Sequence, residues 1–113
     1  MNRSKVGEKI VELISPIIEV SLMQAEVDKF PYCAYEIDAE VPQMSKAGIL
    51  GYKTDLSIYI VAKTESQAAE IAERITSVLP RDNTWDFALQ NKTPATDSGH
   101  WMYKLEYSVT QIL

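Results

Sequence analysis

The sequence is poor in the residues that most enzyme and metal sites require. Its 113 residues include one cysteine, Cys33, and one histidine, His100. A single cysteine excludes an internal disulfide, and no zinc-type spacing of ligands occurs. A Cys–His pair must be in contact to act in nucleophilic catalysis, but the local patterns predict a buried thiol at Cys33 and an exposed turn at His100. We expect no enzymatic activity, no catalytic residue, no metal site and no cofactor.

Glycine, basic clusters and long apolar runs are scarce as well. The four glycines are isolated, and none belongs to a phosphate-binding loop or a nucleotide fingerprint. Sixteen acidic and eleven basic residues give a net charge of −5 without a Lys/Arg cluster, which argues against a nucleic-acid or membrane surface. The longest apolar run near the start is interrupted by Ser15, Pro16 and Glu19, so it is too short to span a membrane. No secretory signal is present, which predicts a protein made in a reducing compartment.

The most regular pattern lies in residues 50–79. Apolar residues occupy every second position over residues 50–63, a period of two that predicts a strand with one buried face. The period then changes to that of an amphipathic helix over residues 64–79. Thr64 or Ser66 can cap this helix, and Pro80 ends it. A long strand that passes directly into a helix is therefore the central unit of the predicted fold.

The other elements follow from the same two periods. Pro16 ends or kinks the first helix, and the apolar segment 17–23 after it is compatible with a continued helix or with an extended piece. Pro42 and the polar residues around the later glycines predict long loops between the strands. The expected elements are a helix at 4–14, strands at 32–41, 50–63, 85–90 and 100–112, a helix at 64–79, and loops at 42–49 and 92–99.

This order, helix-strand-strand-helix-strand-strand, predicts an α+β fold. The connection within each strand pair has no room for a crossover helix, so we expect antiparallel pairing. The prediction is a single domain, residues 1–113, with an antiparallel sheet of about four strands and two helices packed on one face. The other face would carry polar residues together with Tyr59 and Val61, and a partner would partly cover it.

The densest group of carboxylates is the acidic row Glu36, Asp38 and Glu40. Alternation along a strand predicts that the three side chains share one face, about 7 Å apart. One interpretation is a site for a hard cation, since carboxylate oxygens are its preferred ligands. A solvated sheet face near Lys53 and Asp55 also explains the row and is the interpretation we favour, so no metal site is assigned.

Several local phrases, taken with the element order, resemble a known family. They are the Pro-Tyr strand entry at residues 30–35, the long strand 56–64, the alanine- and glutamate-rich helix start 66–72, and the closing strand 103–110. Over residues 4–112 the sequence resembles the small tail-completion (tail-terminator, head–tail joining) proteins of long-tailed bacteriophages and prophages.

The resemblance implies a structural virion protein without catalytic residues. Such a protein closes a ring, commonly a hexamer, at the head-proximal end of the tail tube, and its partners are other copies, the tail tube protein and the head–tail connector protein. It implies assembly in the bacterial cytoplasm and a final place in the virion tail. DNA passes through the ring without specific binding, and an acidic chain without a basic stripe suits such a conduit.

A ring subunit needs two different, complementary surfaces. We predict that the segment 42–51, with Met44 and Lys46, is one contact element. The acidic face of Glu36, Asp38 and Glu40 is the candidate for the lumen or for a charged subunit contact. Two other classes stay open at this point: a small α+β protein-binding adaptor without catalytic activity, and a small enzyme or metal-dependent domain that uses the carboxylate row.

Overall fold

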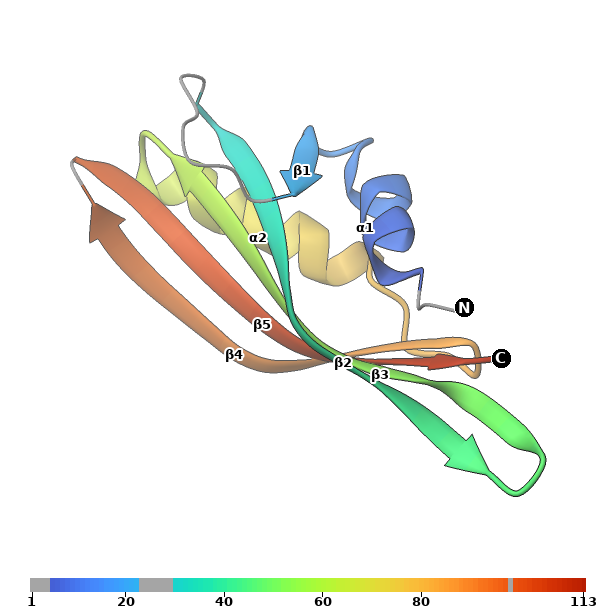
Figure 1. Cartoon of the computed structure of the whole chain (residues 1–113). Helices are drawn as coiled ribbons and strands as arrows, with labels where there is room; N and C mark the ends of the chain where they lie inside the picture. Colours follow the sequence, from blue (N-terminus) through green and yellow to red (C-terminus); the bar gives the residue numbers. More distant parts are fainter. Residues whose placement is uncertain (1–4, 23–29, 98) are drawn as a thin grey trace.

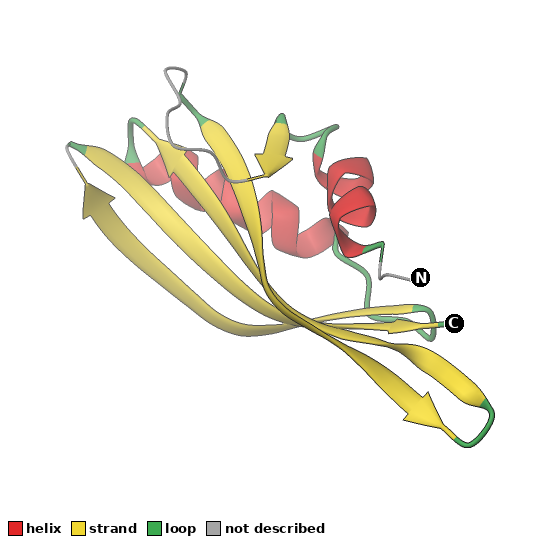
Figure 2. Ribbon diagram, in the orientation of Figure 1, coloured by secondary structure: helices red, strands yellow, loops and turns green. Residues whose placement is uncertain are grey.

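The computed structural model describes residues 5–22, 30–97 and 99–113 and has an α+β fold (Figure 1). A twisted antiparallel sheet forms one layer, and both helices pack on one of its faces (Figure 2). The predicted order helix-strand-strand-helix-strand-strand is confirmed, with one short strand added after the first helix. The elements are α1 (Val6–Ile14), β1 (Val20–Leu22), β2 (Tyr32–Ser45), β3 (Gly48–Ala62), α2 (Glu65–Val78), β4 (Trp85–Asp97) and β5 (His100–Ile112).

The strands lie in the order β1-β2-β3-β5-β4. The four long strands pair antiparallel with their neighbours, and β1 pairs parallel with the start of β2, Val20 lying opposite Cys33. The segment after Pro16 was compatible with helix or extended structure, and it turns and then becomes β1. Because β1 is only three residues long, it covers only the first part of the β2 edge.

The two predicted long loops, 42–49 and 92–99, are wrong: both segments are mostly strand. Strand β2 continues to Ser45 and β3 begins at Gly48, whose φ of 124° is a conformation that glycine adopts readily. The Ser45 hydroxyl accepts a hydrogen bond from the Ala47 N–H and donates one to the Gly48 carbonyl, which closes the turn. Pro42 and Pro94 do not end their strands. Pro42 lies in the part of β2 that β1 does not pair, and Pro94 lies on the edge strand β4, so a missing N–H need not break a ladder bond.

The core lies between the helices and one half of the sheet. Thr64 caps α2 by accepting a hydrogen bond from the Gln67 N–H, as predicted. The alternation predicted for β3 is confirmed where Leu56, Ile58 and Ile60 point to the helices and are at most 1% exposed. The apolar side chains that share this core include Val6, Ile10, Ile14, Cys33, Leu56, Ile58, Ile60, Ile71, Ala72, Ile75, Phe87, Leu105, Tyr107 and Val109.

Two β-bulges interrupt the sheet at the same level. One places Asp38 as an extra residue in β2, and the other places Gln90 as an extra residue in β4. Leu56 of the central strand marks the level, since it pairs with Ile37 on one side and with Tyr107 on the other. Bulges bend the strands that carry them and increase their twist. Figure 2 shows the strands bending, with the β2–β3 hairpin projecting beyond both helices.

Candidate interaction surfaces

The acidic row does not lie on one face, so that prediction is wrong. Residues that pair directly across an antiparallel ladder share a face of the sheet. Glu36 pairs with Ser57 on the outer face, away from the helices, whereas Glu40 pairs with Thr54, which alternates with the core-facing Leu56. The extra residue Asp38 shifts the alternation by one, which moves Glu40 to the opposite face.

Glu36 and Asp38 remain together on the outer face. The Ser57 hydroxyl donates a hydrogen bond of 2.8 Å to an Asp38 carboxylate oxygen. The hydrogen bond between the carboxyls of Glu36 and Asp38 raises the pKa of Glu36, and desolvation and the charge of Asp38 add to the effect. The charge of Lys104 acts in the opposite direction. This pair is therefore a place where an additional positive charge would be stabilised.

A hollow of about 220 Å³ lies on the outer face between the two bulges. Its carboxylates come from three neighbouring strands: Asp38 from β2, Asp55 from β3 and Glu106 from β5. Lys104 lies 3.8 Å from Glu106. The residues that line the hollow are Asp38, Asp55, Leu56, Ser57, Gln90, Glu106 and Tyr107.

The carboxylates around the hollow could bind a cationic group, and the Ser57 hydroxyl there is already hydrogen-bonded to Asp38. Among residues 5–22, 30–97 and 99–113, no group of three or more His, Cys, Asp and Glu side chains is arranged to hold a metal ion. Sequence reasoning placed Asp55 near the acidic row, and the structure brings it to the same hollow as Asp38. It missed Glu106, because only the cross-strand pairing brings that residue to the hollow. Ser57 and Gln90 were missed for the same reason.

The second surface is the end of the β2–β3 hairpin past the Asp38 bulge, residues 39–52, which we call the arm. Met44 is 64% exposed and Leu50 56% exposed. The end of β5 lies beside the arm, since the Leu113 N–H donates a hydrogen bond to the Leu50 carbonyl. Of the ten large apolar side chains exposed in the described residues, six are at this end: Val41, Met44, Ile49, Leu50, Ile112 and Leu113.

The predicted contact residues Met44 and Lys46 therefore lie on a hairpin and not on a loop. Lys46 is exposed in the turn of the arm, and the described part of the chain supplies no ion pair for it. Leu50, another exposed residue, is the extra residue of a third irregularity, since Gln43 pairs with Gly51 and Met44 with Ile49. The structure thus brings an apolar surface and a lysine together at the tip of the arm.

Cys33 and His100 lie in different surroundings. Cys33 is 2% exposed in the core, and burial raises the pKa of its thiol to about 12, so the reactive thiolate is suppressed at neutral pH. The predicted buried thiol is confirmed. His100 is half-buried as the first residue of β5, and its ring stacks on Phe30 at 4.0 Å, so the predicted exposed turn is wrong.

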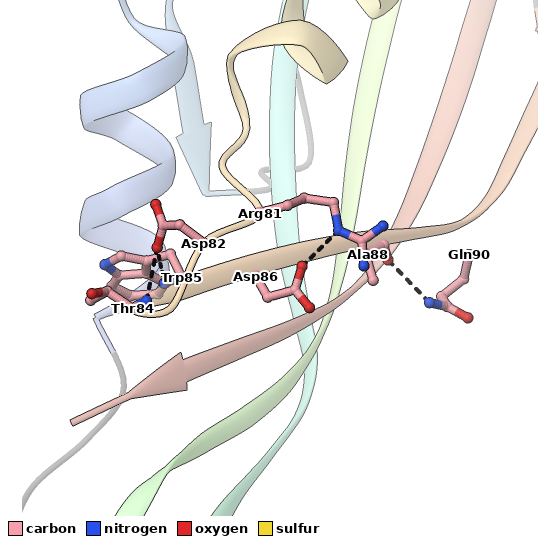
Figure 3. A network of polar contacts seen from close by, with 7 residues as sticks. All are labelled: Arg81, Asp82, Thr84, Trp85, Asp86, Ala88 and Gln90. Carbon is pink, nitrogen blue, oxygen red and sulfur yellow. Dashed lines mark hydrogen bonds and ion pairs between the residues drawn. The ribbon is translucent and has the colours of Figure 1, made fainter.

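A polar network fixes the connection between α2 and β4 (Figure 3). Asp82 accepts hydrogen bonds from the N–H groups of Trp85 and Thr84, which lower the pKa of its carboxyl. Arg81 forms an ion pair of 2.7 Å with Asp86. These contacts join the connection to the start of β4. The predicted turn after Pro80 is confirmed.

Comparisons with known proteins identified no relative of this chain. The sequence matches no model of a known protein family, and a search of curated proteins found no match. Within the described residues, the helices are too short and too polar to cross a membrane. The two surfaces that could bind a partner are the apolar arm and the acidic outer face.

Proposed function

We propose that this chain is a structural subunit of a phage or prophage virion, which caps the tail tube and joins it to the head connector as a closed ring. The observation that carries the proposal is the arm. It projects from the helix-covered part of the sheet and exposes six large apolar side chains together with the nearby strand end. The resemblance of residues 4–112 to tail-completion proteins supplies the biological setting.

A ring subunit must offer two different surfaces that fit each other, and this chain has two candidates. The arm is apolar, like the centre of most protein interfaces, and the outer face around Glu36 and Asp38 is acidic. If these two different surfaces bind each other, contacts between copies run head to tail, and such contacts form a ring when the rotation between neighbouring copies closes.

Energies decide how strong such a ring would be. Full burial of a large aliphatic side chain contributes about 1.5–3 kcal/mol, so burying the exposed half of six contributes about 5–9 kcal/mol. Association costs about 4–15 kcal/mol in lost freedom of motion. The apolar arm alone is roughly balanced by this cost. Ring closure would therefore depend on additional contacts, between charges or with the tail tube.

The charge of the chain is compatible with a conduit for DNA. A surface that holds phosphates needs Lys and Arg, and each such contact adds salt-dependent affinity. The net charge is −5, and Glu36, Asp38, Asp55 and Glu106 gather on one face. The proposal places this face towards the lumen or in a charged contact between subunits. Assembly in the bacterial cytoplasm and incorporation into the tail are part of the proposal.

Light scattering after size exclusion, over a wide range of concentration, tests the proposal. We expect a closed species of about six subunits and ring-shaped particles by negative-stain electron microscopy. Replacing Met44 by Asp should shift the mass to the monomer, whereas Val78→Asp, at an exposed position of α2, should not. A wild-type chain that is monomeric both alone and with tail tubes of the same genome would contradict the proposal.

A small α+β adaptor without catalytic activity is the second candidate. The observation that favours it is the β2 edge, which β1 pairs only as far as Tyr35. Beyond this point, in the part of the chain that the structure describes, β2 has β3 alone as a neighbour, and a partner could add a strand there. A monomer or dimer that ignores tail tubes would favour the adaptor.

A further inference from the structure

The edges of the sheet are poorly suited to join two copies. An antiparallel pairing of two copies along β2, centred on Asp38, would bring the carboxylates of both copies close to each other, which is unfavourable. The bulge at Asp38 and the missing N–H of Pro42 interrupt the same edge. Strand β4 likewise has a bulge, at Gln90, and a proline, at position 94. Such features disfavour strand pairing between two copies of the chain, so the contact between copies would be made by side chains.

The charges of the two surfaces are complementary. Lys46 lies in the turn of the arm and Lys53 at its base, and both are exposed. The hollow on the outer face has carboxylates from Asp38, Asp55 and Glu106 around it. Its volume of about 220 Å³ exceeds several times the roughly 30 Å³ that one water molecule occupies in the liquid, so the end of a lysine side chain can enter.

The outer face also carries apolar side chains against which the apolar residues of the arm could pack. Next to the hollow along β3 and β5 lie Tyr59, opposite Lys104, and Met102, opposite Val61. Tyr59 and Met102 are half-buried on a face that no helix covers. Tyr59 already has Lys104 over its ring at 5.6 Å, which shows that a cation can lie at this position.

We propose that the arm of one copy docks on the outer face of a second copy, with Lys46 in the hollow between the two bulges. Lys46 then pairs with the second copy's Asp38, Asp55 and Glu106, and Met44 and Leu50 pack beside it. This inference rests on the self-assembly in the proposed function and specifies its contact. This contact gives a role to Lys46 and the apolar residues that lie together on the arm. It also gives a role to the acidic pair Glu36 and Asp38 on the outer face.

Charge reversal of the full chain tests the contact. Lys46→Glu and Asp38→Lys should each lower the association constant measured by sedimentation about tenfold or more, because each places like charges together. The combined variant, Lys46→Glu with Asp38→Lys, should recover most of the lost association. Lys63→Glu and Glu73→Lys are matched controls at exposed positions outside both surfaces, and they should associate like wild type. Circular dichroism and thermal melting confirm that each variant is folded.

Three results would overturn the inference: single reversals that associate like their controls, a combined variant no better than the weaker single variant, or a wild-type chain that does not associate. The tail-cap proposal is judged separately by ring mass and by binding to tail tubes. A ring that ignores the reversals, or a monomer that binds tubes, removes this contact and keeps that proposal. Loss of both ring and tube binding removes both.

Discussion

Strand β3 runs through both the helix-covered half of the sheet and the arm, and its apolar residues are buried in the first region and exposed in the second. In the covered half of β3, Ile58 and Ile60 are fully buried, whereas Leu50 at the arm end is 56% exposed. Apolar residues recur along the whole strand, so local sequence does not distinguish the two regions. Packing does, because the last buried residues of β3 towards the tip of the arm are Gly51 and Tyr52. Apolar residues stabilise the fold in one region and remain available for association in the other.

The largest effect on stability should come from opening the covered half. Phe87 is 2% exposed and has the rings of Trp85 and Tyr107 at 6.0 and 6.3 Å. Phe87→Ala should lower the free energy of unfolding by about 3–5 kcal/mol, measured by urea denaturation. Leu50→Ala is the matched change in the arm and should cost less than about 0.5 kcal/mol. Equal losses at the two positions would remove the distinction between the regions.

The boundary between the regions can be disrupted at Gly51. A Cβ at this position would lie 2.0 Å from the Gln111 carbonyl oxygen, and this atom belongs to the backbone of the neighbouring strand. We expect Gly51→Ala to force β3 and β5 apart and to lower the free energy of unfolding by about 1–3 kcal/mol. Thermal unfolding measures the effect. An unchanged melting temperature would show that the strands are not so closely packed at this level.

Alkaline pH should weaken the covered half. Burial raises the pKa of the Cys33 thiol from 9.0 to about 12, so the unfolded chain releases this proton at lower pH than the folded chain. Stability is therefore complete below about pH 9 and falls as the pH rises towards 12, by about 1.4 kcal/mol per pH unit. Burial raises the pKa of Tyr107 to about 12 as well, which adds to the fall above pH 10.

Cys33→Ala removes one of these groups. The variant should be less stable than wild type at pH 7.5, but its stability should decline less steeply between pH 9 and 10.5 in urea titrations. Parallel pH profiles for the two proteins would mean that the buried thiol does not cause the decline.

The smallest effect is expected where a buried polar atom has no partner. In the part of the chain that the structure describes, the Thr54 hydroxyl and the Tyr107 hydroxyl are buried without a hydrogen bond. Thr54→Val removes one such group at nearly constant volume, so the free energy of unfolding should stay within about 1 kcal/mol of wild type or rise. A loss of 2 kcal/mol or more in urea denaturation would reveal a hydrogen bond at this hydroxyl.

The sequence predicted the fold class, the element order and the core face of β3, because these depend on hydrophobic periods that local residues define. It did not predict the long hairpins. A proline usually ends a strand and is tolerated only at a sheet edge, and local sequence does not show that positions 42 and 94 lie at such edges. The bulge at Asp38 could not be predicted from local sequence, because a bulge is defined by the register with the partner strand. One extra residue then divided the acidic row between two faces and joined Asp38 to Asp55 and Glu106.

The measurement that tests the central claim most directly is the mass of wild type and of Leu50→Asp by light scattering at equal concentration. The arm as an assembly surface predicts a wild-type species of about six 12.7-kDa chains and a variant at the mass of one chain, with the same melting temperature. The same mass for both proteins, or a wild type that stays at 12.7 kDa with and without tail tubes, would contradict it.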